Sequence, residues 1–320
     1  MKANTLLLTA LILTNTAFTN TINLNQQSKS EVKLSDKSSD LMSIKLQKPL
    51  VSETKETNEL SLDTWMPDKN LQNATARILR IPLTEVTQER MKDINFFNAE
   101  QEGIINLTGL EYLTNASSVN LKYNSIENLD PLMYLPRLQA LQLTGNQITN
   151  IRPLANLTDL TFLDVNSNLI SQFPTDVIFP KLDGLSVSSN QITEIDFINS
   201  LPVLTHLTID NNPIEDTTPL QDFSKLTYLM LGGYYSRISD ISALKNLTNL
   251  QSLGLFQSSV TDFSPLKDLT NLTSLTIDQT PITSTTDLVN LTNLVTLAIS
   301  DGQLTDIEPI GSLKKLDSLS

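Results

Sequence analysis

The chain lacks residue types on which many catalytic and metal sites depend. Its 320 residues include no cysteine and a single histidine, His206. Without cysteine there is no disulfide framework, no thiolate metal ligand and no cysteine nucleophile. The sequence also contains no GxxxxGK[ST], HExxH or GxSxG motif. His206 has no serine or cysteine partner in a recognisable arrangement. We therefore expect a protein that is not an enzyme and that needs no cofactor.

Positive charge and long apolar runs are also scarce. The chain has 22 Lys and Arg against 35 Asp and Glu, a net charge of −13 at pH 7. We therefore expect neither nucleic acid nor an anionic membrane as a partner. The apolar run from Leu6 to Leu13 is too short to span a membrane, and after Lys2 it is typical of a secretory leader. We expect a signal peptide over residues 1–24 and a flexible polar linker over residues 25–62.

What the sequence does have is a period of 22 residues. An asparagine recurs at this interval, at Asn124, Asn146, Asn168, Asn190 and Asn212. The surrounding frame is L-x-x-L-x-L-x-x-N-x-I, the signature of leucine-rich repeats. After Asn212 two residues are inserted around GGYYS, and the period then continues through Leu255, Ile277 and Ile299. The asparagine position now holds Ser258, Thr280 and Gly302.

The frame combines two apolar spacings because each coil has two parts. Leu141 and Leu143 alternate with polar residues, as in a short strand with one buried face. Ile148 and Ile151 then line the returning segment, and stacked coils share one core. We predict an α/β solenoid over residues 94–320, ending in mid-repeat. This is a leucine-rich-repeat horseshoe with parallel strands on its concave face and 3-10 or irregular segments on its convex face. The five asparagines are predicted to form a structural ladder that satisfies backbone groups in the turns.

The segment before the repeats has a helical pattern instead. In PDKNLQNATARIL, apolar residues recur at helical spacing from Leu71 to Leu79, after Asp68 as a helix start. In LTEVTQERMKD, Thr87 can cap a second short helix. We therefore expect a small helical cap over residues 63–93 that seals the first coil.

These motifs carry a family resemblance. TWMPDKNLQNATARIL, EVTQERMKDINFF and GLEYLTN, running into 22-residue coils, resemble the internalin family of bacterial surface proteins. The resemblance covers the chain from Asp63 to its end. It implies a secreted or cell-surface protein whose concave face binds a protein receptor on a host cell, in adhesion, invasion and virulence. Internalins usually continue with an immunoglobulin-like domain and often a wall anchor, whereas this sequence ends at LKKLDSLS.

The strand frame also predicts which side chains point outward on the concave face. Most are small and polar, but aromatic residues gather near the middle, as in protein-binding hot spots. We predict a binding site that comprises Phe162, Asp164, His206, Asp210, Tyr228, Met230, Tyr234, Tyr235, Phe256 and Asp278. The three aspartates lie in separate coils and therefore predict an acidic surface, not a metal site. We expect the GGYYS insertion to bulge and to project Tyr234 and Tyr235 beside Tyr228.

Two other interpretations stay open at this point. Phosphatase-regulating repeat proteins also use 22-residue coils, so the chain could be a cytosolic scaffold. An open last coil would expose Leu313, Leu316 and Leu319, so the chain could also be a truncated internalin-like product without activity. The sequence does not identify a receptor or an oligomeric state.

Overall fold

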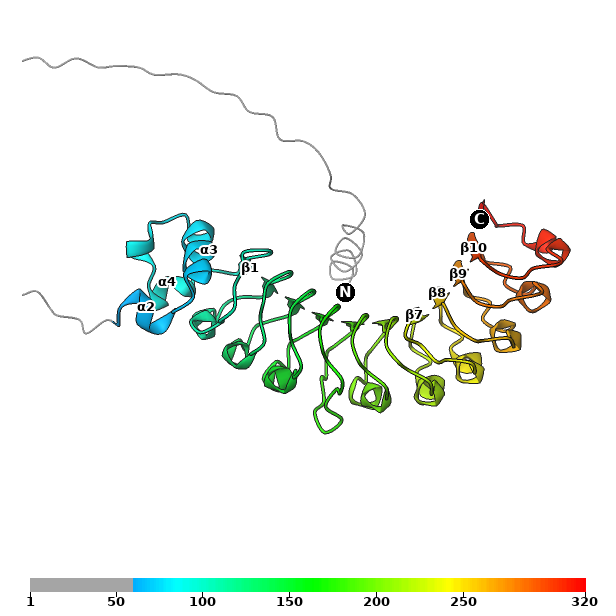
Figure 1. Cartoon of the computed structure of the whole chain (residues 1–320), viewed down its shortest axis with the longest axis horizontal. Helices are drawn as coiled ribbons and strands as arrows, with labels where there is room; N and C mark the ends of the chain where they lie inside the picture. Colours follow the sequence, from blue (N-terminus) through cyan, green and yellow to red (C-terminus); the bar gives the residue numbers. More distant parts are fainter. Residues whose placement is uncertain (1–59) are drawn as a thin grey trace, which may run out of the picture. The chain divides into compact units, whose positions relative to one another are not determined.

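The computed structural model describes residues 60–320, all of which belong to one compact unit (Figure 1). The predicted signal peptide and almost all of the predicted linker lie outside the described residues. The unit begins with a small group of helices and continues as an eleven-stranded parallel sheet whose strands follow chain order. The sheet lines the inner side of the curve and short helices line the outer side (Figure 1). This is the predicted leucine-rich-repeat horseshoe.

The strands are short, and all but the last have either three or five residues. Three-residue strands come first: β1 Phe96–Asn98, β2 Ser118–Asn120, β3 Ala140–Gln142, β4 Phe162–Asp164, β5 Gly184–Ser186 and β6 His206–Thr208. Five-residue strands follow: β7 Tyr228–Gly232, β8 Ser252–Phe256, β9 Ser274–Asp278 and β10 Thr296–Ser300. The last strand is β11 Ser318–Leu319.

The convex returns are mostly single turns of 3-10 helix. They are η2 Leu110–Tyr112, η3 Asp130–Tyr134, η4 Arg152–Asn156, η5 Asp196–Ser200, η6 Thr218–Asp222, η7 Ser242–Asn246, η8 Ser264–Leu266, η9 Thr286–Leu288 and η10 Glu308–Ser312. Between β1 and β11, the return from β4 to β5 is the one without such a turn. There the ring of Phe173 stacks on Phe197 with centroids 4.4 Å apart, so aromatic packing takes the place of the helical turn.

A single apolar core runs the length of the described unit. Leu141 and Leu143 are fully buried, as are Ile148 and Ile151 from the return of the same coil. Strand residues with inward side chains therefore face the return residues across a narrow core, as the two spacings predict. Each coil buries its leucines against the coils on both sides, which is why stacking stabilises the array.

The helical cap closes the first coil. It contains α2 Leu62–Trp65, α3 Lys69–Leu79, η1 Leu83–Glu85 and α4 Gln88–Met91. Thr87 accepts a hydrogen bond from the N–H of Arg90 and so caps α4, as predicted. Trp65 is buried and lies edge-on to Tyr112 of the first coil, with ring centroids 5.6 Å apart. The tryptophan is thus a packing residue that joins the cap to the repeats.

Asp68 connects the cap to the repeats through hydrogen bonds. One of its carboxylate oxygens accepts from the N–H groups of Asn70 and Leu71 at the start of α3, at 2.9 and 3.0 Å. The other oxygen accepts from Ile105 and Asn106 in the first coil, at 2.8 and 3.0 Å. Burial alone would raise the pKa of Asp68, but these four backbone donors hold that pKa below its ordinary value.

Candidate protein-binding face

The outward side chains of the sheet form straight columns, because neighbouring strands pair without slippage. In the first column Phe162 pairs with Gly184, Gly184 with His206, and His206 with Tyr228. In the second, Thr208 pairs with Met230 and Met230 with Gly254. In the third, Gly232 pairs with Phe256 and Phe256 with Asp278. Residues far apart in sequence thus become neighbours on one surface.

The asparagines lie at one end of the strands, where the chain turns away from the sheet. Asn168 is typical: its side-chain nitrogen donates to the carbonyl oxygens of Leu143, Val165 and Asn166, each at 3.0 Å. Its side-chain oxygen accepts from the N–H of Ile148 at 3.0 Å. The other four also donate to carbonyls of two coils and accept a backbone N–H: Asn124, Asn146, Asn190 and Asn212. These contacts join successive coils and hold the strand ends in register.

Aromatic side chains meet at the centre of the concave face. The rings of His206 and Tyr228 are stacked, with centroids 5.9 Å apart and planes inclined by 25°. Met230 and Phe256 both lie over Gly254, where a Cβ atom would come within 2.3 Å of the Met230 sulfur and 2.6 Å of the Phe256 ring. His206, Tyr228, Met230 and Phe256 all remain partly exposed. We call these four side chains the aromatic centre.

The acid–base properties of the aromatic centre follow from its partial burial. Burial lowers the pKa of His206, and the nearby negative charge of Asp183 opposes this shift. The imidazole Nδ1 lies 2.7 Å from the hydroxyl of Thr205, which in turn bonds to Asp183. Burial raises the pKa of Tyr228, and the negative charge of Asp210 raises it further. The phenol is therefore neutral at physiological pH and lies within the field of a carboxylate.

Two of the predicted contact residues are almost covered. Phe162 is 9% exposed and Asp164 is 5% exposed. Asp164 forms an ion pair with Lys122, two coils away, at 3.2 Å. The charge of Asp164 is therefore balanced within the chain. Phe162 and Asp164 both expose little surface that a partner could contact.

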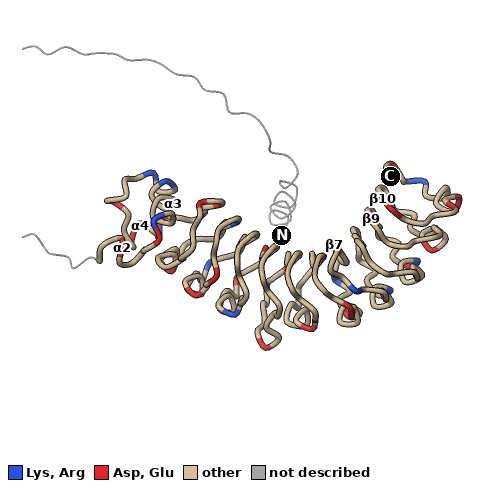
Figure 2. The backbone as a smooth tube through the Cα atoms, viewed as in Figure 1, with Lys and Arg blue, Asp and Glu red and all other residues tan. Residues whose placement is uncertain are grey.

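The other two predicted aspartates accept hydrogen bonds from neutral side chains. Asp210 accepts hydrogen bonds from the hydroxyl of Ser188 at 2.6 Å and from the side-chain amide of Asn211 at 2.8 Å. Asp278 accepts a hydrogen bond from the hydroxyl of Ser300. Neither carboxylate belongs to an ion pair within residues 60–320. Charged residues are sparse along the strands and gather on the convex returns and the cap (Figure 2).

The expected position of Tyr234 and Tyr235 is wrong. Both rings are exposed and pack edge-on against each other, with centroids 5.1 Å apart. However, they follow the last residue of β7, whereas Tyr228 is its first. Four residue steps along a strand span roughly 13 Å, so the pair lies around the end of the sheet and not beside Tyr228. β7 runs straight on for five residues before the chain turns at Gly232 and Gly233, both with positive φ.

The sequence interpretation missed one exposed aromatic on the concave face. Phe96 begins β1 and is 65% exposed, in register with Ser118. The next residue, Phe97, is buried, so strand alternation places Phe96 on the outward side. It lies far along the sheet from the aromatic centre, since β2 to β5 separate it from β6.

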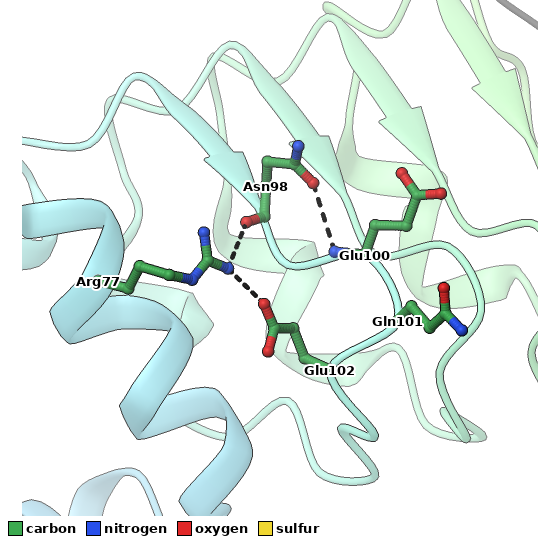
Figure 3. Close-up of a pocket in the computed structure, with 5 residues that line it drawn as sticks. All are labelled: Arg77, Asn98, Glu100, Gln101 and Glu102. Atoms are coloured by element: carbon green, nitrogen blue, oxygen red, sulfur yellow. Dashed lines mark hydrogen bonds and ion pairs between the residues drawn. The ribbon is translucent and has the colours of Figure 1, made fainter. Parts of the chain in front are cut away.

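A polar depression marks the joint between the cap and the first coil (Figure 3). Arg77 of α3 donates to the carbonyl oxygen of Asn98 at 3.2 Å and pairs with Glu102. Glu100 and Gln101 complete the lining. The charge of Arg77 is satisfied by its own chain, so we interpret this contact as a structural joint. Within residues 60–320 no group of three or more acidic or histidine side chains is arranged to hold a metal ion.

Comparison with known proteins agrees with this architecture. The family described as Leucine Rich repeats (2 copies) matches residues 136–176 and 180–222. An internalin (inlF) from Listeria monocytogenes superposes with a TM-score of 0.60 at 27% identity, over 83% of this chain and 99% of the other. The chain is internalin-like. Internalin C2 (inlC2) from the same species has a TM-score of 0.52 at 25% identity, over 82% of this chain and 96% of the other.

A more distant structure shares the fold alone. The leucine-rich-repeat protein LIC12759 of Leptospira interrogans has a TM-score of 0.62 at 20% identity, covering 72% of this chain and 62% of the other. No curated protein matches the sequence significantly. The internalin-like chain thus carries a leucine-rich-repeat module of the kind that binds proteins on its concave surface. In residues 60–320 we find no helix that is both long and apolar enough to cross a membrane.

Proposed function

We propose that this internalin-like chain is an exported, non-enzymatic binding protein whose concave face recognises a protein receptor on a host cell. The observation that carries the proposal is the aromatic centre. Partly exposed aromatic and methionine side chains in the middle of a concave sheet have the composition of a binding hot spot. The leader-like sequence at the N-terminus and the resemblance to internalins support export and a location outside the cell.

The proposed contact surface has a core and an extension. Its core consists of His206, Tyr228, Met230 and Phe256, with Asp210 and Asp278 at the margin. Its extension consists of Tyr234 and Tyr235, which continue the exposed aromatic surface around the end of β7. Phe162 and Asp164 are almost buried within the concave face, so we assign them a packing role and no direct contact with the partner.

Binding of the labelled protein to cultured host cells tests this proposal. Replacing Tyr228 by alanine should weaken cell binding roughly tenfold, because truncating a hot-spot aromatic removes more than about 1 kcal/mol. Tyr134→Ala is the matched control, since Tyr134 is exposed on the convex η3 turn. Equal binding by both variants would contradict a concave site.

Two further measurements separate the parts of the proposal. The joint substitution of Tyr234 and Tyr235 by alanine should weaken binding if the surface continues around the end of β7, and unchanged affinity would confine it to the aromatic centre. The intact mass of native protein in culture supernatant tests export. A mass matching removal of the leader supports it, and an uncleaved chain found only inside cells would favour the cytosolic scaffold.

A further inference from the structure

The concave face differs in charge balance along its length. On the early strands the carboxylate of Asp164 is neutralised by Lys122 at 3.2 Å. From β5 to β9, the outward positions and the residues just before each strand carry no Lys or Arg. They do carry Asp183, Asp210 and Asp278, none of which takes part in an ion pair within the described part of the chain. This part of the face is therefore acidic and unbalanced.

The unbalanced carboxylates are held in fixed positions. Ser188 and Asn211 each donate to a different oxygen of Asp210, and both donors are neutral. Thr205 donates to Asp183, and Ser300 donates to Asp278. Neutral donors orient a carboxylate without cancelling its charge. A partner that supplied a cation would find the acceptor already ordered and would pay little side-chain entropy.

The aromatic centre lies between these carboxylates. Asp183 is near His206, Asp210 is near Tyr228, and Asp278 pairs in register with Phe256. The face of an aromatic ring attracts a cation, and the attraction is stronger where the pair is shielded from water. An arginine or lysine can lay its aliphatic stem on Met230 or Phe256 while its charged group reaches a carboxylate.

We propose that the aromatic centre and its three flanking aspartates form a docking surface for a protein segment rich in arginine and lysine. The proposal rests on the proposed function above and specifies the chemistry of its partner. Charge complementarity selects this occupant: an acidic or neutral segment would leave three ordered carboxylates without counter-charges when water is excluded. It also predicts that association is steered by charge and is sensitive to salt.

Selection from a phage-displayed library of random dodecapeptides tests the proposal with the full chain as bait. We expect selected peptides to be enriched in Arg and Lys over Asp and Glu. For individual peptides, the double variant Asp210→Asn with Asp278→Asn should raise Kd about tenfold or more, as expected for losing charge-assisted contacts. Raising NaCl from about 0.05 M to about 0.5 M should weaken binding to the wild type much more than to this variant.

Two controls make the outcome specific. Asp222→Asn removes the same charge from the exposed convex end of η6 and should leave Kd unchanged. Tyr228→Ala reports whether a peptide occupies the aromatic centre at all. Circular dichroism on each variant confirms that it folds.

The possible results distinguish the two proposals. Peptides that depend on Tyr228 but show no basic enrichment, or no response to the aspartate variants, would overturn the basic partner and leave the binding face intact. A selection that yields no peptide dependent on Tyr228 would count against both the basic partner and the concave binding site.

Discussion

The two halves of the repeat array form the same coil by different means. From β2 to β6 the strands have three residues, and an asparagine side chain donates a hydrogen bond to the carbonyl of the residue just after each strand, as at Leu143 and Val165. From β7 to β10 the strands have five residues, and the equivalent positions after β8, β9 and β10 hold Ser258, Thr280 and Gly302. The hydroxyls of Ser258 and Thr280 lie 3.2 Å apart and reach far fewer backbone groups.

The difference in strand length shows how backbone groups keep hydrogen-bond partners where the asparagine side chain is absent. In the first half the carbonyl of Leu143 accepts from both Asn146 and Asn168. Where asparagine is absent, backbone pairing extends by two residues, as between Gly232 and Phe256 or Ile277 and Ile299. Buried backbone groups need partners, so the strands lengthen to provide them. The aromatic centre lies at the boundary between the three-residue strands with asparagine and the five-residue strands without it.

The largest expected loss of stability would come from replacing one ladder asparagine by alanine. Asn168→Ala should cost about 3–5 kcal/mol of unfolding free energy, because several buried backbone groups lose their partner. Thr280→Ala, at the same frame position, should cost about 1 kcal/mol, since its hydroxyl bonds mainly to Asp278 and Ser258. Urea denaturation of both variants measures the contrast. Equal losses would mean that the asparagines do not bear more of the stability than their replacements.

Removing a charge should have a smaller effect on the free energy of unfolding, and the effect should differ between the two halves of the array. Lys122→Met should cost about 2–3 kcal/mol, because it leaves the nearly buried Asp164 without a counter-charge. The double variant Lys122→Met with Asp164→Leu should recover most of that loss. Asp210→Asn should change stability by no more than about 0.5 kcal/mol, since Asp210 forms no ion pair within residues 60–320. A similar cost for both single variants in urea titrations would remove the proposed charge difference between the halves.

The smallest effect concerns pH and His206. Burial lowers the folded-state pKa of His206 below its ordinary value of 6.5, with Asp183 opposing. His206 therefore binds a proton more readily in the unfolded chain than in the folded one. The contribution of neutral His206 to the free energy of unfolding is complete above the ordinary pKa and is lost as pH falls through the folded-state pKa. His206→Gln should flatten this part of the pH dependence of the thermal midpoint only slightly, because the imidazole is partly exposed. A profile that stays as steep would assign the dependence to other groups.

The repeat spacing predicted the register of the sheet because one residue of slippage would expose every leucine. Alternation around Leu141 and Leu143 identified the buried side, and the recurrence of asparagine located each turn. Helix-start chemistry also placed α3 and α4 correctly, since Asp68 and Thr87 act through their immediate neighbours. These features are local or strictly periodic.

The exposure of individual face residues could not be predicted in the same way. Alternation assigns Phe162 and Asp164 to the concave side, but their burial depends on side chains from other coils. The pair between Lys122 and Asp164 skips a strand and has no counterpart in a 22-residue period. The path of the insertion depends on Gly232 and Gly233, whose positive φ values turn the chain only after β7 has lengthened.

The straight columns of the concave face have an evolutionary consequence. Because each strand pairs with the next at the same frame position, a whole coil can be gained or lost without disturbing the core packing of the remainder. Loss of residues 184–205 would place Phe162 directly against His206 and create a new row of aromatic neighbours. Duplication of the same span would move them further apart. Recombination between coils can therefore rewrite what the surface recognises in a single step, while leaving intact the leucines that fold it.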